Sequence, residues 1–178
     1  MRARGIDPYP ARTSRTHSAA EAIAAFEAWE AAAQADLGGE AATVQAEALD
    51  APIVTVAGRM TASRDMGKAS FIDVRDGSER IQCFIKKDLV GEEAYAGLAD
   101  LDLGDFIAVS GPLMRTRAGE VTVEARRYTV LAKALRPPPE KWHGIEDIEI
   151  RYRQRYLDLM ANAEAREIFR VRAAVVAA

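Results

Sequence analysis

Two short runs of alternating apolar and polar residues, 69–76 and 79–86, hold the side chains with the clearest binding chemistry. Phe71 stands in the first run, and Gln82 and Phe84 stand in the second. An aromatic ring stacks on an unpaired base, and an amide both donates to and accepts from a base edge. If the two runs are neighbouring strands, these residue types indicate a surface that binds single-stranded nucleic acid.

The alternation predicts which side chains share a face of this hairpin, because successive strand residues point to opposite sides. The predicted inward set is Ile72, Val74, Ile81, Cys83 and Ile85. If residues 77–78 form the turn, Phe71 lies opposite Phe84 and Asp73 lies opposite Gln82. An aromatic pair and an amide then share a polar, partly basic outer face.

Cations for phosphate contacts are available nearby. Arg64 and Lys68 are predicted to lie in the loop before the first of the two strands. A second interpretation is that Phe71 and Phe84 form a cross-strand aromatic pair covered by an N-terminal helix or a neighbouring subunit. The alternation alone does not decide between the two.

Groups for catalysis or metal binding are sparse. Cys83 is predicted to point inward, and His17 and His143 lie in predicted loops, so no Ser/His/Asp or Cys/His arrangement can be assembled. No Gly-rich loop that would cradle a phosphate is present. We therefore expect the 178-residue chain to bind without catalysing, and to hold no cofactor or metal of its own.

Composition narrows the class of partner. The 178 residues include 24 Lys and Arg against 27 Asp and Glu, a net charge of −3, which excludes binding of nucleic acid through bulk positive charge. One cysteine cannot form an internal disulfide. No apolar run approaches the roughly 20 residues that span a bilayer. These features favour the cytoplasm and exclude a membrane partner.

The elements that position the site follow from periodicity. Ser18 stands three residues before Glu21, the spacing of a capping box, and predicts a helix start. Apolar residues then recur at helical spacing, including Phe26 and Trp29, and the helix is expected to end before Gly38.

From residue 53 onwards the period changes to two. The five strand-like runs are 53–62, 69–76, 79–86, 105–116 and 119–130. A short helical pattern, residues 92–101, separates the third run from the fourth. This order predicts a mainly β fold, a five-stranded OB-fold barrel with an N-terminal helix and a C-terminal helical segment, and such barrels bind oligonucleotides on strands 2 and 3.

A proline-rich joint suggests a domain boundary. Residues 137–139 are three consecutive prolines, which hold the chain extended. We expect a linker at 136–146 between an OB-fold domain at 1–135 and helices at 147–178.

Two helical stretches are expected beyond the joint, at 147–160 and 163–178, with Asn162 as a cap between them. Ile168 and Val175 still mark an apolar face where the sequence ends. The chain is therefore expected to be truncated.

A family resemblance rests on several stretches. The longest, residues 135–159, reads LRPPPEKWHGIEDIEIRYRQRYLDL. The others are GIDPYP at 5–10, VAGR at 56–59 with GKASF at 67–71, and GDF at 104–106 with RTRAGE at 115–120. The longest stretch closely resembles the linker between the anticodon-binding and catalytic domains of bacterial-type, class II lysyl-tRNA synthetases, and the other stretches resemble the same family.

The resemblance implies an OB-fold that reads the uridine-rich lysine anticodon, with the central uridine stacked on Phe71. The implied polar contacts to the bases come from Arg64, Gln82 and Glu120. Candidates for phosphate contacts are Lys68, Arg59 and Arg115.

For the full-length protein the resemblance implies attachment of lysine to its tRNA, with ATP and Mg²⁺, by a homodimer. The ATP- and lysine-binding motifs of that family are absent from this sequence, so the chain alone is expected to be inactive. An alternative is a stand-alone OB-fold module that binds single-stranded RNA or tRNA. Aspartate or asparagine ligases, which match the linker poorly, and a purely structural role for residues 146–178 are further alternatives. DNA is not an expected partner.

Overall fold

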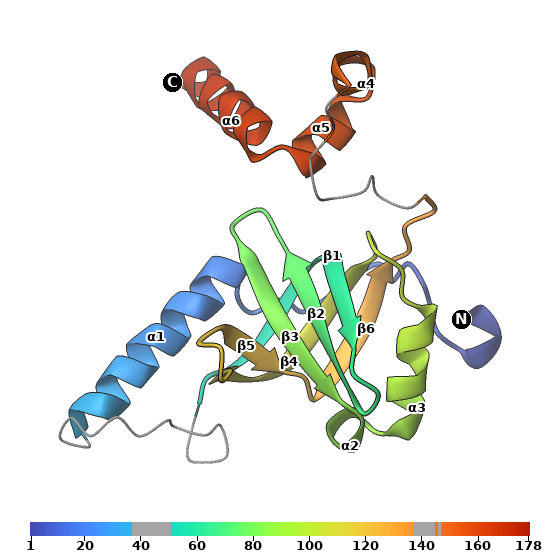
Figure 1. Ribbon diagram of the computed structural model, residues 1–178, viewed down its shortest axis with the longest axis vertical. Helices are drawn as coiled ribbons and strands as arrows, with labels where there is room; N and C mark the ends of the chain where they lie inside the picture. The colour runs from blue at the N-terminus through green and yellow to red at the C-terminus, as the bar shows by residue number, and fades with distance from the viewer. Residues whose placement is uncertain (37–50, 137–144, 146) are drawn as a thin grey trace. The chain divides into compact units, whose positions relative to one another are not determined.

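The computed structural model describes residues 1–36, 51–136, 145 and 147–178 of the chain (Figure 1). The chain divides into two compact units, residues 1–135 and 136–178, which are described separately. Within the described ranges, no helix combines the length and apolar character needed to cross a membrane.

The first unit contains six strands and several short helices. Its strands are β1 (Ile53–Asp65), β2 (Ala69–Arg75), β3 (Arg80–Lys86), β4 (Phe106–Arg115), β5 (Val121–Glu124) and β6 (Arg127–Ala132). Its helices are η1 (Arg2–Arg4), α1 (Ala19–Asp36), α2 (Lys87–Val90), α3 (Glu92–Ala96) and η2 (Gly97–Asp100).

Five of the strands form a closed hydrogen-bonded ring. The strand order in the sheet is β1-β2-β3-β5-β4-β6, and an additional pairing of β1 with β4 closes the ring. Only the β3–β5 pair is parallel among the strand pairs described here. The prediction of a mainly β, five-stranded OB-fold with flanking helices is confirmed.

One predicted strand is wrong in its extent. The run expected at 119–130 is two strands, β5 and β6, which follow one another along β4. At the break, Ala125 N donates to Phe84 O at 2.9 Å and Arg126 N donates to Ser110 O at 2.8 Å. The chain bends here because β5 must turn away from the direction of β6 to pair with β3 and close the ring.

The predicted facing of β2 and β3 is confirmed. The five residues expected to point inward are each at most 1% exposed. The pairing register places Phe71 opposite Phe84 and Asp73 opposite Gln82, as expected for a turn at residues 77–78. The hairpin therefore presents its aromatic pair on the face away from the core.

Helix α1 is held to the ring at its start. The capping box forms, with Glu21 Oε2 accepting from Ser18 N at 2.8 Å. Asp76 Oδ2, in the β2–β3 turn, accepts from Ala19 N at 2.9 Å, and Ser78 Oγ accepts from Ala20 N at 3.1 Å. The turn thus satisfies two N–H groups at the helix start, which have no partner within the helix.

The second unit consists of three helices. Their bounds are α4 (Ile148–Arg153), α5 (Arg155–Ala161) and α6 (Ala163–Ala177). The first predicted stretch is therefore interrupted at Gln154, whose backbone leaves the helical conformation. Asp158, fully buried, accepts from Arg151 and Arg155, and this pairing holds α4 to α5 across the break.

Asn162 occupies the predicted cap position but does not make the hydrogen bond expected of a capping side chain. Asn162 precedes α6, but its side chain does not cap that helix. Its Nδ2 donates instead to Asp158 Oδ1 at 2.5 Å. The expected linker at 136–146 lies almost entirely outside the described residues.

Candidate nucleic-acid interface

A pocket of about 700 Å³ lies on the outer face of the β2–β3 hairpin, beside the turn that joins β4 to β5. Five of the seven residues predicted as nucleic-acid contacts line it, and the predicted Lys68 and Arg59 do not. The full lining comprises Arg64, Met66, Phe71, Gln82, Phe84, Met114, Arg115, Thr116, Arg117, Ala118 and Glu120.

The apolar surface of the pocket includes an aromatic pair. The ring centroids of Phe71 and Phe84 lie 4.9 Å apart with an interplanar angle of 35°. Both side chains are half-buried. Since the pair lines an open pocket and is not covered by α1, the arrangement offers a ring face to a base.

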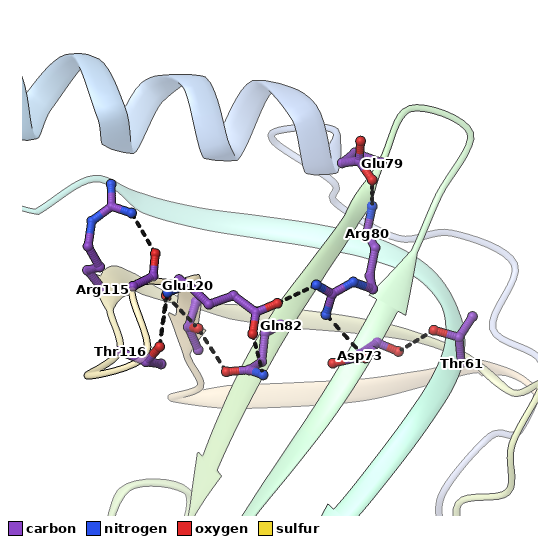
Figure 2. A network of polar contacts seen from close by, with 10 residues as sticks. Thr61, Asp73, Glu79, Arg80, Gln82, Arg115, Thr116 and Glu120 are labelled. Atoms are coloured by element: carbon purple, nitrogen blue, oxygen red, sulfur yellow. Dashed lines mark hydrogen bonds and ion pairs between the residues drawn. The ribbon is translucent and has the colours of Figure 1, made fainter.

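A polar edge formed by Gln82 and Glu120 lines the same pocket as the aromatic pair. Figure 2 shows the polar contacts of these two residues. Gln82 Nε2 donates to Glu120 Oε2 at 2.9 Å, and Thr122 Oγ1 donates to Gln82 Oε1 at 3.1 Å. Gln82 is only 4% exposed, so this residue of the outer face is covered by its neighbours instead of open to water. Both ends of the amide therefore have a partner in the free chain.

Arg80 holds the Glu120 carboxylate from the side opposite Gln82, as Figure 2 shows. Its Nη2 donates to Glu120 Oε1, and its Nη1 lies 3.2 Å from Asp73 Oδ2. Burial lowers the pKa of Arg80, but the hydrogen bond that it donates to Glu120 and the charge of Asp73 outweigh this effect, so the pKa is raised overall. The guanidinium thus stays charged between two carboxylates.

Arg115 ties the pocket to α1. Its Nε and Nη2 donate to Glu30 Oε1 and Oε2 at 2.9 and 2.6 Å, and its Nη1 donates to Gly119 O at 2.7 Å. The hydrogen bond from Arg115 lowers the pKa of Glu30, and the pKa of Arg115 is raised by the same contact. The ion pair therefore links α1 to the turn that carries Glu120.

Three cations at or near the rim remain available. Arg64, Lys68 and Arg117 are exposed and form no salt bridge with any residue that the structure describes. Arg64 was expected in a loop, but it lies in β1, paired with Phe71 of β2. The longer β1 places Arg64 opposite Phe71, and both residues line the pocket.

Arg59 lies away from the pocket. It pairs with Arg75 at the far end of β2 from Phe71. Its guanidinium lies 4.3 Å from the ring centroid of Phe106, and its Nη1 donates to Gly104 O at 3.1 Å. Burial lowers the pKa of this group.

Two residues of the site, Arg80 and Thr122, are not predicted from the sequence. Alternation places Arg80 on the outer face, but its partner Glu120 lies 40 positions later, on a turn brought alongside only when β5 pairs with β3. Thr122 faces Gln82 across that same pairing. No local signal in the sequence indicates either contact.

The described residues contain no group of three or more His, Cys, Asp or Glu side chains that could hold a metal ion. The chemistry available here is stacking, hydrogen bonding and charge pairing.

Comparison with known proteins agrees with this geometry. Residues 54–131 match the family described as an OB-fold nucleic acid binding domain. The strand ring therefore matches a tRNA anticodon-binding OB-fold domain.

Relatives that match the whole chain narrow the comparison further than the match to residues 54–131 does. The lysine-tRNA ligases of Dehalococcoides mccartyi strain 195, Pelotomaculum thermopropionicum and Xylella fastidiosa strain M23 are 44%, 40% and 46% identical to it. Each alignment covers all of this chain but only 33%, 31% and 33%, respectively, of the length of the relative. The chain is thus homologous to the N-terminal region of lysine-tRNA ligases and spans about a third of their length.

These comparisons confirm the resemblance proposed from the sequence and favour the ligase interpretation over a stand-alone binding module.

Proposed function

We propose that the chain reads the lysine anticodon as the N-terminal part of a lysine-tRNA ligase. The observation that carries this proposal is the pocket in which an aromatic pair adjoins the Gln82–Glu120 polar edge. That combination matches the needs of an unpaired base, a plane for stacking and fixed groups for its edge.

The proposed roles follow from position. The central uridine stacks on Phe71, and Arg64, Gln82 and Glu120 contact base edges. Lys68, two residues after Met66 of the pocket lining, contacts a phosphate. Phosphate contacts from Arg59 and Arg115 stay predictions, and each competes with the protein partners that these guanidinium groups already have.

The whole protein, on this proposal, attaches lysine to its tRNA in the cytoplasm as a homodimer, with ATP and Mg²⁺ bound outside the described residues. The present chain contributes recognition of the tRNA and not the reaction.

The direct test is fluorescence anisotropy with two RNA stem-loops. One carries a UUU anticodon, and the other has its central uridine changed to cytidine. Tighter binding of the UUU loop supports the proposal. Equal binding would favour a general single-strand binder, and absence of binding to either loop would contradict a nucleic-acid role for the pocket.

A further inference from the structure

We infer that Arg80, acting through Glu120, fixes the direction of the Gln82 amide and thereby sets which base edge the pocket accepts. This inference rests on the proposed function, because it concerns the specificity of the same site. Arg80 does not line the pocket and is a positioning residue.

The direction of the amide follows from hydrogen-bond chemistry. An ionised carboxylate only accepts hydrogen bonds, so Glu120 Oε2, 2.9 Å from Gln82, requires the amide nitrogen on its side. The amide oxygen must then face Thr122, whose Oγ1 lies 3.1 Å away. Because an amide nitrogen carries two hydrogens, one remains to donate to a ligand.

Thr122 cannot hold this direction alone. Its hydroxyl both donates and accepts. In addition to Gln82 Oε1, it lies 3.2 Å from the backbone oxygen of Glu120, to which it can also donate. If the amide reversed, Thr122 would donate to that backbone oxygen and accept from the amide nitrogen. The carboxylate of Glu120 therefore decides between the two directions.

Arg80 keeps that carboxylate in place. Its guanidinium spans Asp73 on β2 and Glu120 on the β4–β5 turn, with 3.2 Å from Nη1 to Asp73 Oδ2. Glu120 is about one-third exposed and lies on a turn. Apart from Arg80, no cation among the described residues forms a salt bridge with Glu120. If Arg80 were lost, the Glu120 carboxylate would turn toward water and release the Gln82 amide.

The consequence is a preference at the base edge. A fixed Gln82 presents a donor to the pocket, which suits the carbonyl oxygens of uracil. Cytosine has an amino group in place of the O4 carbonyl. Its amino donor would face the donor of Gln82, and no hydrogen bond could form between them. A reversed amide would present an oxygen and accept cytosine at that position.

The test measures discrimination instead of affinity alone. The full 178-residue chain is titrated with the UUU stem-loop and with the loop whose central base is cytidine. We expect Arg80→Met to lower the ratio of the two affinities by about tenfold, and Arg80→Lys, which keeps a charge, to restore most of it. A purely structural role for Arg80 predicts weaker binding to both loops at an unchanged ratio, and that result would overturn the inference.

Two further variants make the result specific. Glu120→Gln removes the carboxylate's requirement for a donor, so it should lower the ratio as Arg80→Met does, and combining the two should add nothing. Arg126→Met breaks another arginine-carboxylate pair, 2.7 Å to Glu124, outside the pocket and should leave the ratio unchanged.

A second measurement needs no RNA and separates this inference from the proposed function. In ¹⁵N NMR spectra of the free chain, the Gln82 side-chain amide should show a hydrogen-bonded proton that Arg80→Met abolishes. If the wild-type chain does not distinguish the two loops, the proposed function is wrong. An amide signal unchanged by Arg80→Met would show that Arg80 does not position Gln82.

Discussion

At the scale of a single residue, the proposed recognition depends most on stacking at Phe71. The ring is half-buried against Phe84, which holds its plane in one orientation, while its other surface lines the pocket. A ring ordered before binding loses little conformational freedom when a base stacks on it.

Replacing Phe71 by alanine should therefore cost about 1–3 kcal/mol of binding to the UUU stem-loop, because the stacking plane is lost. Anisotropy titration measures the change. Tyr9→Ala removes another exposed aromatic ring, outside the pocket, and serves as the control with unchanged binding. Equal affinities for wild type and Phe71→Ala would refute the role of this ring.

Gly111 shows a different single-residue constraint, on packing. A Cβ at this position would lie 1.9 Å from the backbone oxygen of Glu124, where β4 passes the break between β5 and β6. Backbone cannot move aside as the end of a flexible side chain does.

We expect Gly111→Ala to destabilise the fold by about 3 kcal/mol, since the strands at the closure of the ring must separate. Gly77→Ala is the matched control, because nothing lies within 4 Å of a Cβ there, and should change stability by less than about 0.5 kcal/mol. Denaturant unfolding of both variants makes the comparison. Similar stabilities for the two variants would contradict the proposed close approach.

At the scale of elements, the β2–β3 turn both ends the hairpin and caps α1. Asp76 Oδ1 accepts from Ser78 N at 2.7 Å and from Glu79 N at 3.1 Å, while its Oδ2 accepts from Ala19 N at 2.9 Å. One carboxylate thus shapes the turn and fixes the start of the helix.

Loss of this carboxylate should detach the start of α1. We expect Asp76→Ala to lower the free energy of unfolding by about 2 kcal/mol. The start of the helix loses a charged hydrogen-bond acceptor, and the N–H groups of the turn lose the same acceptor. Asp88→Ala, at a side chain that is 70% exposed, should have an effect below about 0.5 kcal/mol. If chemical denaturation gives equal losses for the two variants, the capping role is wrong.

The same contacts predict a pH dependence. Burial raises the pKa of Asp76, but hydrogen bonds from Ser78, Ala19 and Glu79 outweigh it and hold the pKa below its ordinary value. A carboxyl group with a lowered pKa in the folded state stabilises the fold above its unfolded pKa, and this contribution disappears as pH falls through the folded pKa.

The difference in stability between wild type and Asp76→Ala should therefore be largest above about pH 5 and shrink toward about pH 3. Unfolding curves recorded across this range test it. A difference that stays constant with pH would mean that the charge of Asp76 does not contribute.

At the scale of the whole molecule, the net charge of −3 gives little long-range attraction for RNA. Attraction must come from the few free cations near the pocket, namely Arg64, Lys68 and Arg117. Specific binding should therefore depend weakly on salt.

We expect the logarithm of the association constant to fall with the logarithm of salt concentration with a slope of about −1.4, the value for two phosphate contacts to a single strand, from Lys68 and Arg117, because Arg64 is proposed to contact a base edge. Lys68→Ala should reduce the slope by about 0.7, whereas Arg12→Ala, outside the pocket, should leave it unchanged. Titrations at several salt concentrations give the slopes. A much steeper slope would indicate a larger basic surface than the pocket.

Local patterns in the sequence determined the elements. Alternation predicted the facing of β2 and β3, since a strand has a fixed period of two, and the 77–78 turn then set the register that brings Phe71 against Phe84. The capping box at Ser18 and Glu21 likewise depends on residues three apart in the chain. Such features need no knowledge of distant contacts.

Only the tertiary structure decided how distant segments meet. It divided the run at 119–130, because closing the ring against β3 requires β5 to bend away from β6. It also brought Glu120 to Arg80 and Gln82, about 40 positions away, and Glu30 to Arg115, 85 positions away. These contacts depend on ring closure and helix docking, which are cooperative properties of the folded chain and leave no periodic trace in its sequence.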